Sequence, residues 1–117
     1  MLNIITFYII YSIQELPNTA TKTRGEQDLE DFEVVFRALA HRSRRSILII
    51  LQSTGGTMTA GDIVERFSYA WPTMTRHLQQ LEQAGLITVH KKSREQFYTL
   101  NKERLSATVN KWLKWFK

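Results

Sequence analysis

Residues 67–81 carry the most informative side-chain chemistry in this chain. Met74, Leu78 and Leu81 recur at i, i+4 and i+7, which predicts an amphipathic helix with one apolar stripe. Amide, hydroxyl and guanidinium groups are the ones that recognise base edges in a major groove. At about 100° per residue, the side chains of these types that project away from the stripe are Thr73, Arg76, Gln79, Gln80 and Gln83. Glu82 is the only acid of this helix, so we expect the polar face to meet a patterned polyanion.

Charge is divided unevenly along the 117 residues. Residues 1–36 hold two basic and six acidic side chains, whereas residues 37–117 hold fourteen basic and five acidic ones. The length allows one small domain. A small basic domain favours a polyanionic partner, for which double-stranded DNA is the first expectation and anionic lipid the alternative.

This sequence lacks the residues that several functional classes require. Zero cysteines exclude disulfides and thiolate metal sites, which fits a cytoplasmic protein. The sequence shows no paired carboxylates at a useful spacing, no Gly-rich phosphate loop and no nucleophile motif, so neither an enzyme nor a bound cofactor is expected. His41, His77 and His90 each stand alone in their segments, so no metal site is expected either.

Residues 1–27 are predicted to form an N-terminal extension and linker, and residues 28–117 the folded domain. The first 16 residues are apolar but too few to span a bilayer, which needs about 20. They also lack the basic start and cleavage site of a signal peptide, so no membrane association is expected. An additional packing or dimerisation element, a disordered extension and a membrane-contacting segment remain the alternatives for this stretch.

Periodicity and capping residues predict helices over about 28–40, 43–54, 60–67, 72–84 and 101–117. The first helix should begin near Asp28, and His41 or Ser43 should cap the second. Pro72 suits the first turn of the fourth helix, and Gly85 suits its C-terminus. Residues 87–90 and 97–100 are predicted strands, joined by a basic tip at 91–96.

This order predicts a mainly α fold with a small β-hairpin, a winged helix-turn-helix. Three stretches resemble the ArsR family of small bacterial repressors: residues 38–48 (ALAHRSRRSIL), residues 72–87 (PTMTRHLQQLEQAGLI) and residues 97–100 (FYTL). The sequence departs from the family pattern at Ala70, where the family usually has a capping serine, at Arg42 in place of proline, and at Ser93 in place of glycine.

The resemblance implies a homodimer, built from the first and last helices, that binds a palindromic operator in double-stranded DNA and represses transcription. Many members of the family sense metals through cysteines, or through Asp and His pairs, that are missing here. The expected repressor therefore has no metal ligand, and a protein effector is one candidate for its control.

Candidate site residues follow from the helix faces and the wing. The expected DNA contacts are Trp71, Thr73, Thr75, Arg76, His77 and Gln79 on the helix, with Lys91, Lys92 and Arg94 on the wing. The expected dimer interface is Phe32, Phe36, Leu105, Val109, Trp112 and Phe116.

Three of these assignments have alternatives. Trp71 could instead fold back on its own core, and His77 could be a half-buried residue that bridges helices. The wing lysines could form only a solvated loop. Arginines at the start of the second helix, Arg42, Arg44 and Arg45, could bind further phosphates.

A winged-helix protein-interaction adaptor without specific DNA binding is the alternative function. An adaptor would more often present an apolar patch where this chain has a polar helix face and a basic wing.

Overall fold

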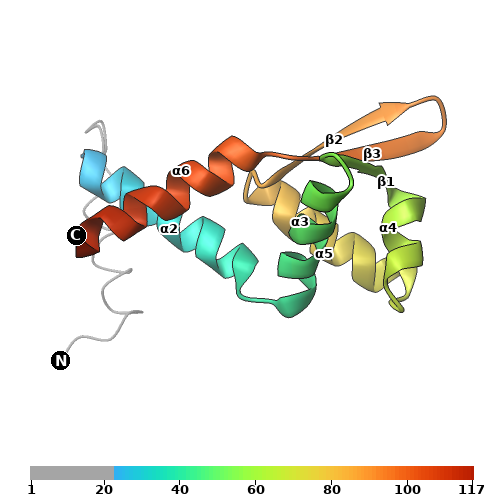
Figure 1. The fold of residues 1–117 in the computed structure, drawn as a ribbon, viewed down its shortest axis with the longest axis horizontal. Helices are drawn as coiled ribbons and strands as arrows, with labels where there is room; N and C mark the ends of the chain where they lie inside the picture. The colour runs from blue at the N-terminus through green and yellow to red at the C-terminus, as the bar shows by residue number, and fades with distance from the viewer. Residues whose placement is uncertain (1–22) are drawn as a thin grey trace, which may run out of the picture.

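The computed structural model describes residues 23–117, so the expectations for residues 1–22 lie outside the described part of the chain. In chain order the elements are α2 (Arg24–Leu39), α3 (Arg42–Ser53), β1 (Thr57–Thr59), α4 (Ala60–Arg66), α5 (Trp71–Gln83), β2 (Ile87–Lys92), β3 (Glu95–Leu100), α6 (Lys102–Leu113) and the 3₁₀ helix η1 (Lys114–Phe116). In Figure 1, α2 and α6 occupy one end, while α3, α4, α5 and the sheet occupy the other. The predicted mainly α fold with a small hairpin is confirmed.

α2 begins at Arg24, earlier than the predicted start near Asp28. The hydroxyl of Thr23 accepts from the N–H of Glu26 at 3.1 Å, and the Glu26 carboxylate accepts from the N–H of Thr23 at 2.8 Å. This reciprocal capping box satisfies backbone donors that the first helical turn would leave without partners. The predicted start was too late because Gly25 and the neighbouring threonines are residue types typical of a linker.

The core lies at the junction of α3, α5 and the sheet. The stripe predicted from the sequence is confirmed, since Met74 and Leu81 are fully buried and Leu78 is 2% exposed. The other large side chains with almost no exposed surface are Val35, Ile47, Leu51, Ile63, Leu86 and Ile87. Burial of each such side chain contributes about 1.5–3 kcal/mol, so the apolar side of α5 is held firmly in the domain.

The sheet is antiparallel with the strand order β1-β3-β2, and β1 was not expected. Its three residues pair with β3 in the register Thr57 with Thr99 and Thr59 with Phe97. The two threonine hydroxyls, Thr57 Oγ1 and Thr99 Oγ1, lie 3.0 Å apart. A strand of this length is too short to show an alternating pattern. The partners that stabilise it also lie far away in the sequence.

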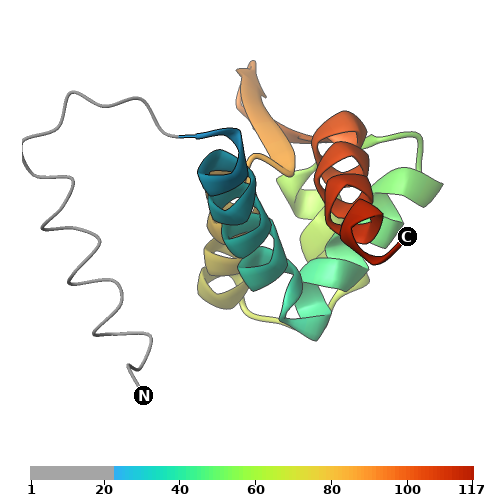
Figure 2. The same cartoon turned by 90° about the vertical axis from the view of Figure 1, so that its left-hand side faces the viewer.

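α6 begins as predicted at the N-cap Asn101, whose side-chain oxygen accepts from the N–H of Arg104 at 3.3 Å. The helix packs beside α2, and Figure 2 looks onto this end of the molecule. Two ion pairs join the helices, Asp31 with Arg104 at 3.4 Å and Asp28 with Lys111 at 3.7 Å.

Replacing Leu81 by alanine should lower the free energy of unfolding by about 2–5 kcal/mol, because the cavity would lie beneath α5. Leu81 is fully buried, whereas Ile49 on α3 is 68% exposed. Ile49→Ala is therefore the control and should change stability by about 0.5 kcal/mol or less. Urea unfolding measures both, and equal costs for the two variants would contradict this description of the core.

Candidate nucleic-acid interface

α5 presents a polar face directly opposite its buried stripe. Its exposed side chains beyond the first turn are Thr75, Arg76, Gln79, Gln80, Glu82 and Gln83, and Thr73 is half-buried. Guanidinium and amide groups can form bidentate contacts to guanine and adenine, and hydroxyls can bond to either base or to phosphate. A rigid helix that carries these groups in a row has the chemistry to recognise base edges.

The N-terminus of α5 lacks a side-chain cap. Ala70 is the N-cap residue, no side chain there bonds to the first turn, and Pro72 lies in that turn as predicted. Proline needs no acceptor for a backbone N–H at this position, which removes one donor from those the helix leaves without partners. The remaining backbone N–H groups form a partial positive charge at this end of α5, which favours an anion.

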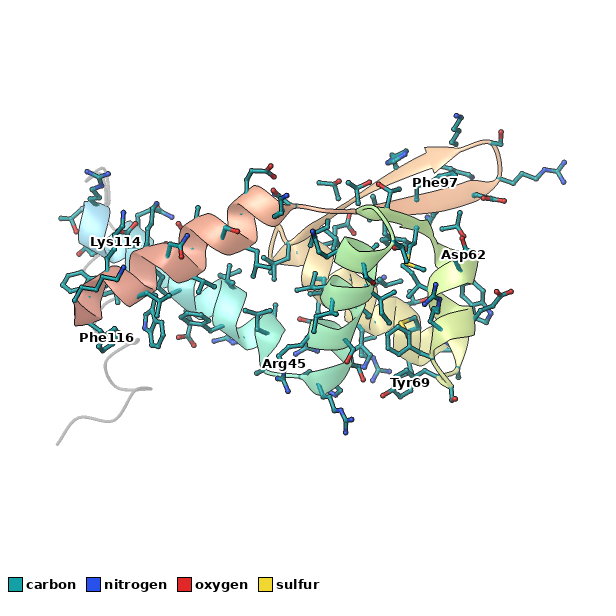
Figure 3. The ribbon with its side chains drawn as sticks, viewed as in Figure 1. Arg45, Asp62, Tyr69, Phe97, Lys114 and Phe116 are labelled. Atoms are coloured by element: carbon teal, nitrogen blue, oxygen red, sulfur yellow. The ribbon has the colours of Figure 1, made fainter. Side chains whose placement is uncertain are left out.

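Two aromatic residues flank this helix start. Trp71 is 54% exposed, so it does not fold back into the core, which was the alternative for this residue. Tyr69 is 42% exposed, its hydroxyl accepts from Ser43 Oγ at 2.7 Å, and its ring stacks on Phe67 at 5.9 Å. Tyr69 was not predicted from periodicity, because it lies in the irregular turn between α4 and α5 (Figure 3). Tyr69 is therefore held by contacts within the chain, and Trp71 is exposed at the start of α5.

His77 was expected among the DNA contacts, and the structure corrects this. The residue is only 8% exposed, with its ring 4.4 Å from that of His41 and 6.2 Å from that of Tyr69. Its Nδ1 atom lies 3.4 Å from Nη1 of Arg44. The alternative of a histidine that bridges helices is the one that the structure bears out, because His77 joins α5 to the start of α3.

The surroundings of His77 disfavour its protonated form. Burial lowers the pKa of the imidazole below its ordinary value, and the positive charges of His41, Arg44 and Arg76 lower it further. His41 is itself the N-cap of α3, as predicted, and its Nδ1 accepts from the N–H of Ser43 at 3.1 Å. His77 therefore supports this junction in its neutral form.

Arg42, Arg44 and Arg45 were candidates for further phosphate contacts, and the side chains of Arg44 and Arg45 form hydrogen bonds within the chain. Arg44 donates from Nε to the carbonyl of Ala38 at 2.7 Å and from Nη2 to that of Arg37 at 3.2 Å. Arg45 donates from Nη1 to the carbonyl of Leu39 at 2.8 Å. These carbonyls lie at the end of α2, where that of Arg37 also accepts from the N–H of Ala40 at 3.2 Å, so the arginines supply further donors to the C-terminus of the helix.

The wing has a tighter tip than the sequence indicated. Pairing continues from Lys91 with Gln96 to Lys92 with Glu95, so the predicted strand ends at residues 90 and 97 were wrong. Ser93 and Arg94 alone form the turn, and Ser93 has φ 58°, a value that glycine adopts more readily. The side chains of Lys91, Lys92 and Arg94 are all exposed.

The inner face of the wing is tied to α5. Tyr98 is 7% exposed, and its hydroxyl donates to Oε1 of Gln96 at 3.1 Å. Burial raises the pKa of this phenol and the carboxylate of Glu82 raises it further, so the group remains a neutral donor. The base of the wing therefore packs in the same core as the buried side of α5.

The expected dimer residues lie on the α2–α6 end of the molecule. The ring of Trp112 meets Phe36 edge-on at 5.2 Å and Phe116 at 5.0 Å. Trp112 and Phe116 are 39% and 72% exposed, and Phe36, Leu105 and Val109 are half-buried. Figure 3 shows Phe116 at the far end of this helix pair from Tyr69.

Phe32 differs from the rest of that set. It is 6% exposed within the single chain, so a second chain could reach little of its ring. Its burial beside Phe36, at a ring separation of 6.3 Å, makes it a support for the exposed aromatic side chains. We therefore leave Phe32 out of the proposed interface.

Within residues 23–117, no group of three or more His, Cys, Asp or Glu side chains is placed to hold a metal ion. The helices of this part of the chain also include none with the length and apolar character needed to cross a bilayer.

Comparison with known proteins finds related regulators. A family model for a helix-turn-helix domain matches residues 39–90. The transcriptional repressor SdpR of Bacillus subtilis is 42% identical over 79 residues, which are 68% of this chain and 84% of SdpR. The arsenical resistance operon repressor of Staphylococcus xylosus is 30% identical over 76 residues, 65% of this chain and 71% of that protein. A crystal structure of an ArsR family transcriptional regulator matches with a TM-score of 0.65 and 32% identity, covering 73% of this chain and 84% of the other.

Acidification should destabilise the domain through His77. Because its folded-state pKa lies below the unfolded value of about 6.5, its contribution is complete above that pH and is lost as the pH falls through the folded pKa. Because one proton is involved, the free energy of unfolding can change by at most about 1.4 kcal/mol per pH unit. Urea unfolding at a series of pH values between about 5 and 8 measures this loss.

Two variants test whether His77 causes the pH dependence of the free energy of unfolding. His77→Gln should flatten the pH dependence of the free energy of unfolding, whereas His90→Gln on the exposed wing should retain the wild-type slope. A wild-type slope in His77→Gln would show that another group is responsible.

Proposed function

This chain belongs to the ArsR family of DNA-binding transcriptional repressors, and we propose that it binds a palindromic operator as a homodimer with α5 as its recognition helix. The observation that carries the proposal is the exposed face of α5, which offers amide, hydroxyl and guanidinium groups and a single acid, Glu82. The buried stripe on the opposite side fixes this face relative to the rest of the domain.

We assign base contacts to the N-terminal half of α5, which would enter the major groove first. The residues are Thr73, Thr75, Arg76 and Gln79, of which Thr73 is half-buried and the others exposed. Arg76 is the strongest candidate, because a bidentate guanidinium contact to guanine discriminates by about 1–3 kcal/mol.

Phosphate contacts are assigned to both sides of that helix. Trp71, at the start of α5, would stack on sugar and backbone, next to helix N–H groups that favour a phosphate. Lys91, Lys92 and Arg94 on the wing would contact the neighbouring backbone or minor groove. These contacts supply affinity that falls with salt but carry little sequence information.

We assign the dimer interface to Phe36, Leu105, Val109, Trp112 and Phe116. Exposure of aromatic side chains such as Trp112 and Phe116 to water is energetically unfavourable in a monomer. Their exposed apolar surface therefore supports contact with a second copy of the chain. A two-fold axis through this end would place the two α5 helices about one DNA turn apart, which is about 34 Å.

Fluorescence anisotropy tests the assignment of α5. The probes are a duplex selected by the wild-type protein from a random pool and a scrambled duplex of the same composition. Wild type should prefer the selected duplex by about a thousandfold or more. Arg76→Gln should lose about 5- to 150-fold on the selected duplex, which corresponds to about 1–3 kcal/mol, and much less on the scrambled one.

Lys92→Gln is the matched control, since it also removes one exposed positive charge. It should weaken binding to both duplexes by a similar factor. It should also reduce by about 1 the slope of the logarithm of the binding constant against the logarithm of the salt concentration. Equal losses on both duplexes for Arg76→Gln would remove α5 from base recognition. Absence of any wild-type preference would favour an adaptor over a specific operator-binding protein.

A charge at the exposed aromatic end should separate the dimer. Phe116→Glu is expected to yield a monomer by light scattering and to lose about a hundredfold or more in operator affinity, because the two half-sites are no longer linked. Ala107→Glu adds the same charge to an exposed position on the other side of α6 and should retain both properties. A Phe116→Glu monomer with wild-type affinity would contradict this interface.

A further inference from the structure

The beginning of α6 is bonded directly to the end of α5. Three successive carbonyls, those of Ala84, Gly85 and Leu86, accept hydrogen bonds from two residues of the α6 start. Arg104 Nε donates to Ala84 at 3.2 Å, Asn101 Nδ2 to Gly85 at 2.9 Å, and the Asn101 N–H to Leu86 at 2.9 Å. Carbonyls that follow a helix end need such partners, so these bonds fix the C-terminal end of α5.

Arg104 also reaches a third helix. Its Nη1 atom lies 3.4 Å from Oδ1 of Asp31 on α2, and both side chains are largely shielded, at 30% and 26% exposure. The positive guanidinium lies at the negative end of the α5 dipole, which adds a favourable interaction. One side chain therefore connects α6, α2 and α5.

Gly85 makes room for this connection. It has φ +76°, and a Cβ added there would come within 3.2 Å of Nε and 3.7 Å of Cδ of Arg104. The residue thus serves two purposes, since it permits the left-handed turn after α5 and leaves space for the arginine to cross the helix end.

We propose that Arg104 is a positioning residue for operator recognition, which sets the angle of α5 relative to the α2–α6 pair and so the half-site spacing that the dimer accepts. The inference rests on the proposed function, in which that pair surrounds the two-fold axis. α5 otherwise packs chiefly on α3 and β2, so the bonds at its C-terminus are a direct link to the dimer helices.

The geometry gives this link leverage over the DNA contacts. A helix of 13 residues is about 20 Å long, so a tilt of about 10° at its C-terminus moves its N-terminal end by about 3 Å. That displacement is close to the rise of one base pair. Loss of the Arg104 contacts should therefore loosen the spacing between the two recognition helices before it affects folding.

Lysine at position 104 should not perform the role of this arginine. Nε and Nη1 of the guanidinium point to different partners at the same time, whereas a lysine ammonium is a single point charge on a flexible stem. Arg104→Lys keeps the net charge and removes the geometry, so it separates the two contributions.

The test measures the spacing profile, which is the affinity for the operator as a function of the distance between its two half-sites. Affinity is compared for the selected operator and for duplexes with one base pair added or removed between its half-sites. Wild type should lose about tenfold or more on either altered duplex. Arg104→Gln and Arg104→Lys should bind the native spacing about tenfold more weakly and should show a much smaller difference among the three duplexes.

Lys102→Gln is the matched control, because Lys102 is an exposed cation close to Arg104 on the same helix. It should retain the wild-type spacing profile. Light scattering should show dimers for all variants, and the affinity ratio between spacings does not depend on the active fraction of a preparation. This makes the ratio informative even for a variant that folds poorly.

Two outcomes would overturn the proposal, and they are distinguishable. Wild-type protein that binds no duplex specifically removes the proposed function and this inference with it. A wild type with a sharp spacing preference, together with Arg104 variants that share its profile, removes only the role of Arg104.

Discussion

The side chains of Met74, Leu78 and Leu81 are packed into the core against α3 and the sheet, and this burial fixes the orientation of α5. An amphipathic helix anchored along one side has only its opposite side available for a partner. In this chain that side carries polar groups with one acid, so the same packing that stabilises the domain determines which groups α5 presents to a partner. In the proposed function, recognition and stability are therefore coupled through one helix.

Part of the basic character of the chain is structural. Arg44 and Arg45 cap the end of α2, and Arg104 crosses the end of α5, each with its guanidinium on backbone carbonyls. Helix C-termini attract such groups because their last carbonyls lack partners and carry partial negative charge. The net charge therefore overstates the number of cations that are available to a polyanion, and the proposed function assigns that role to the exposed cations of α5 and the wing.

Periodicity predicted the helices and the α5 face, because residues such as Met74 and Leu81 are buried by their own element's amphipathic pattern. It failed where tertiary contacts decide. β1 forms by pairing with Thr99 and its neighbours, which lie far away in the sequence. The start of α2 was missed for a local reason, because a capping box between Thr23 and Glu26 extends the helix beyond its apolar stripe. His77 lies beside the stripe, and its burial depends on rings contributed by other segments.

Hydroxyl-radical footprinting of the protein on its selected duplex would test the central claim most directly. A dimer with two α5 helices in successive major grooves should protect two equivalent patches about 10 base pairs apart on one face, with weaker flanking protection from the wings. One isolated patch would contradict the two-fold arrangement. Uniform protection along the duplex would contradict recognition of sequence by α5.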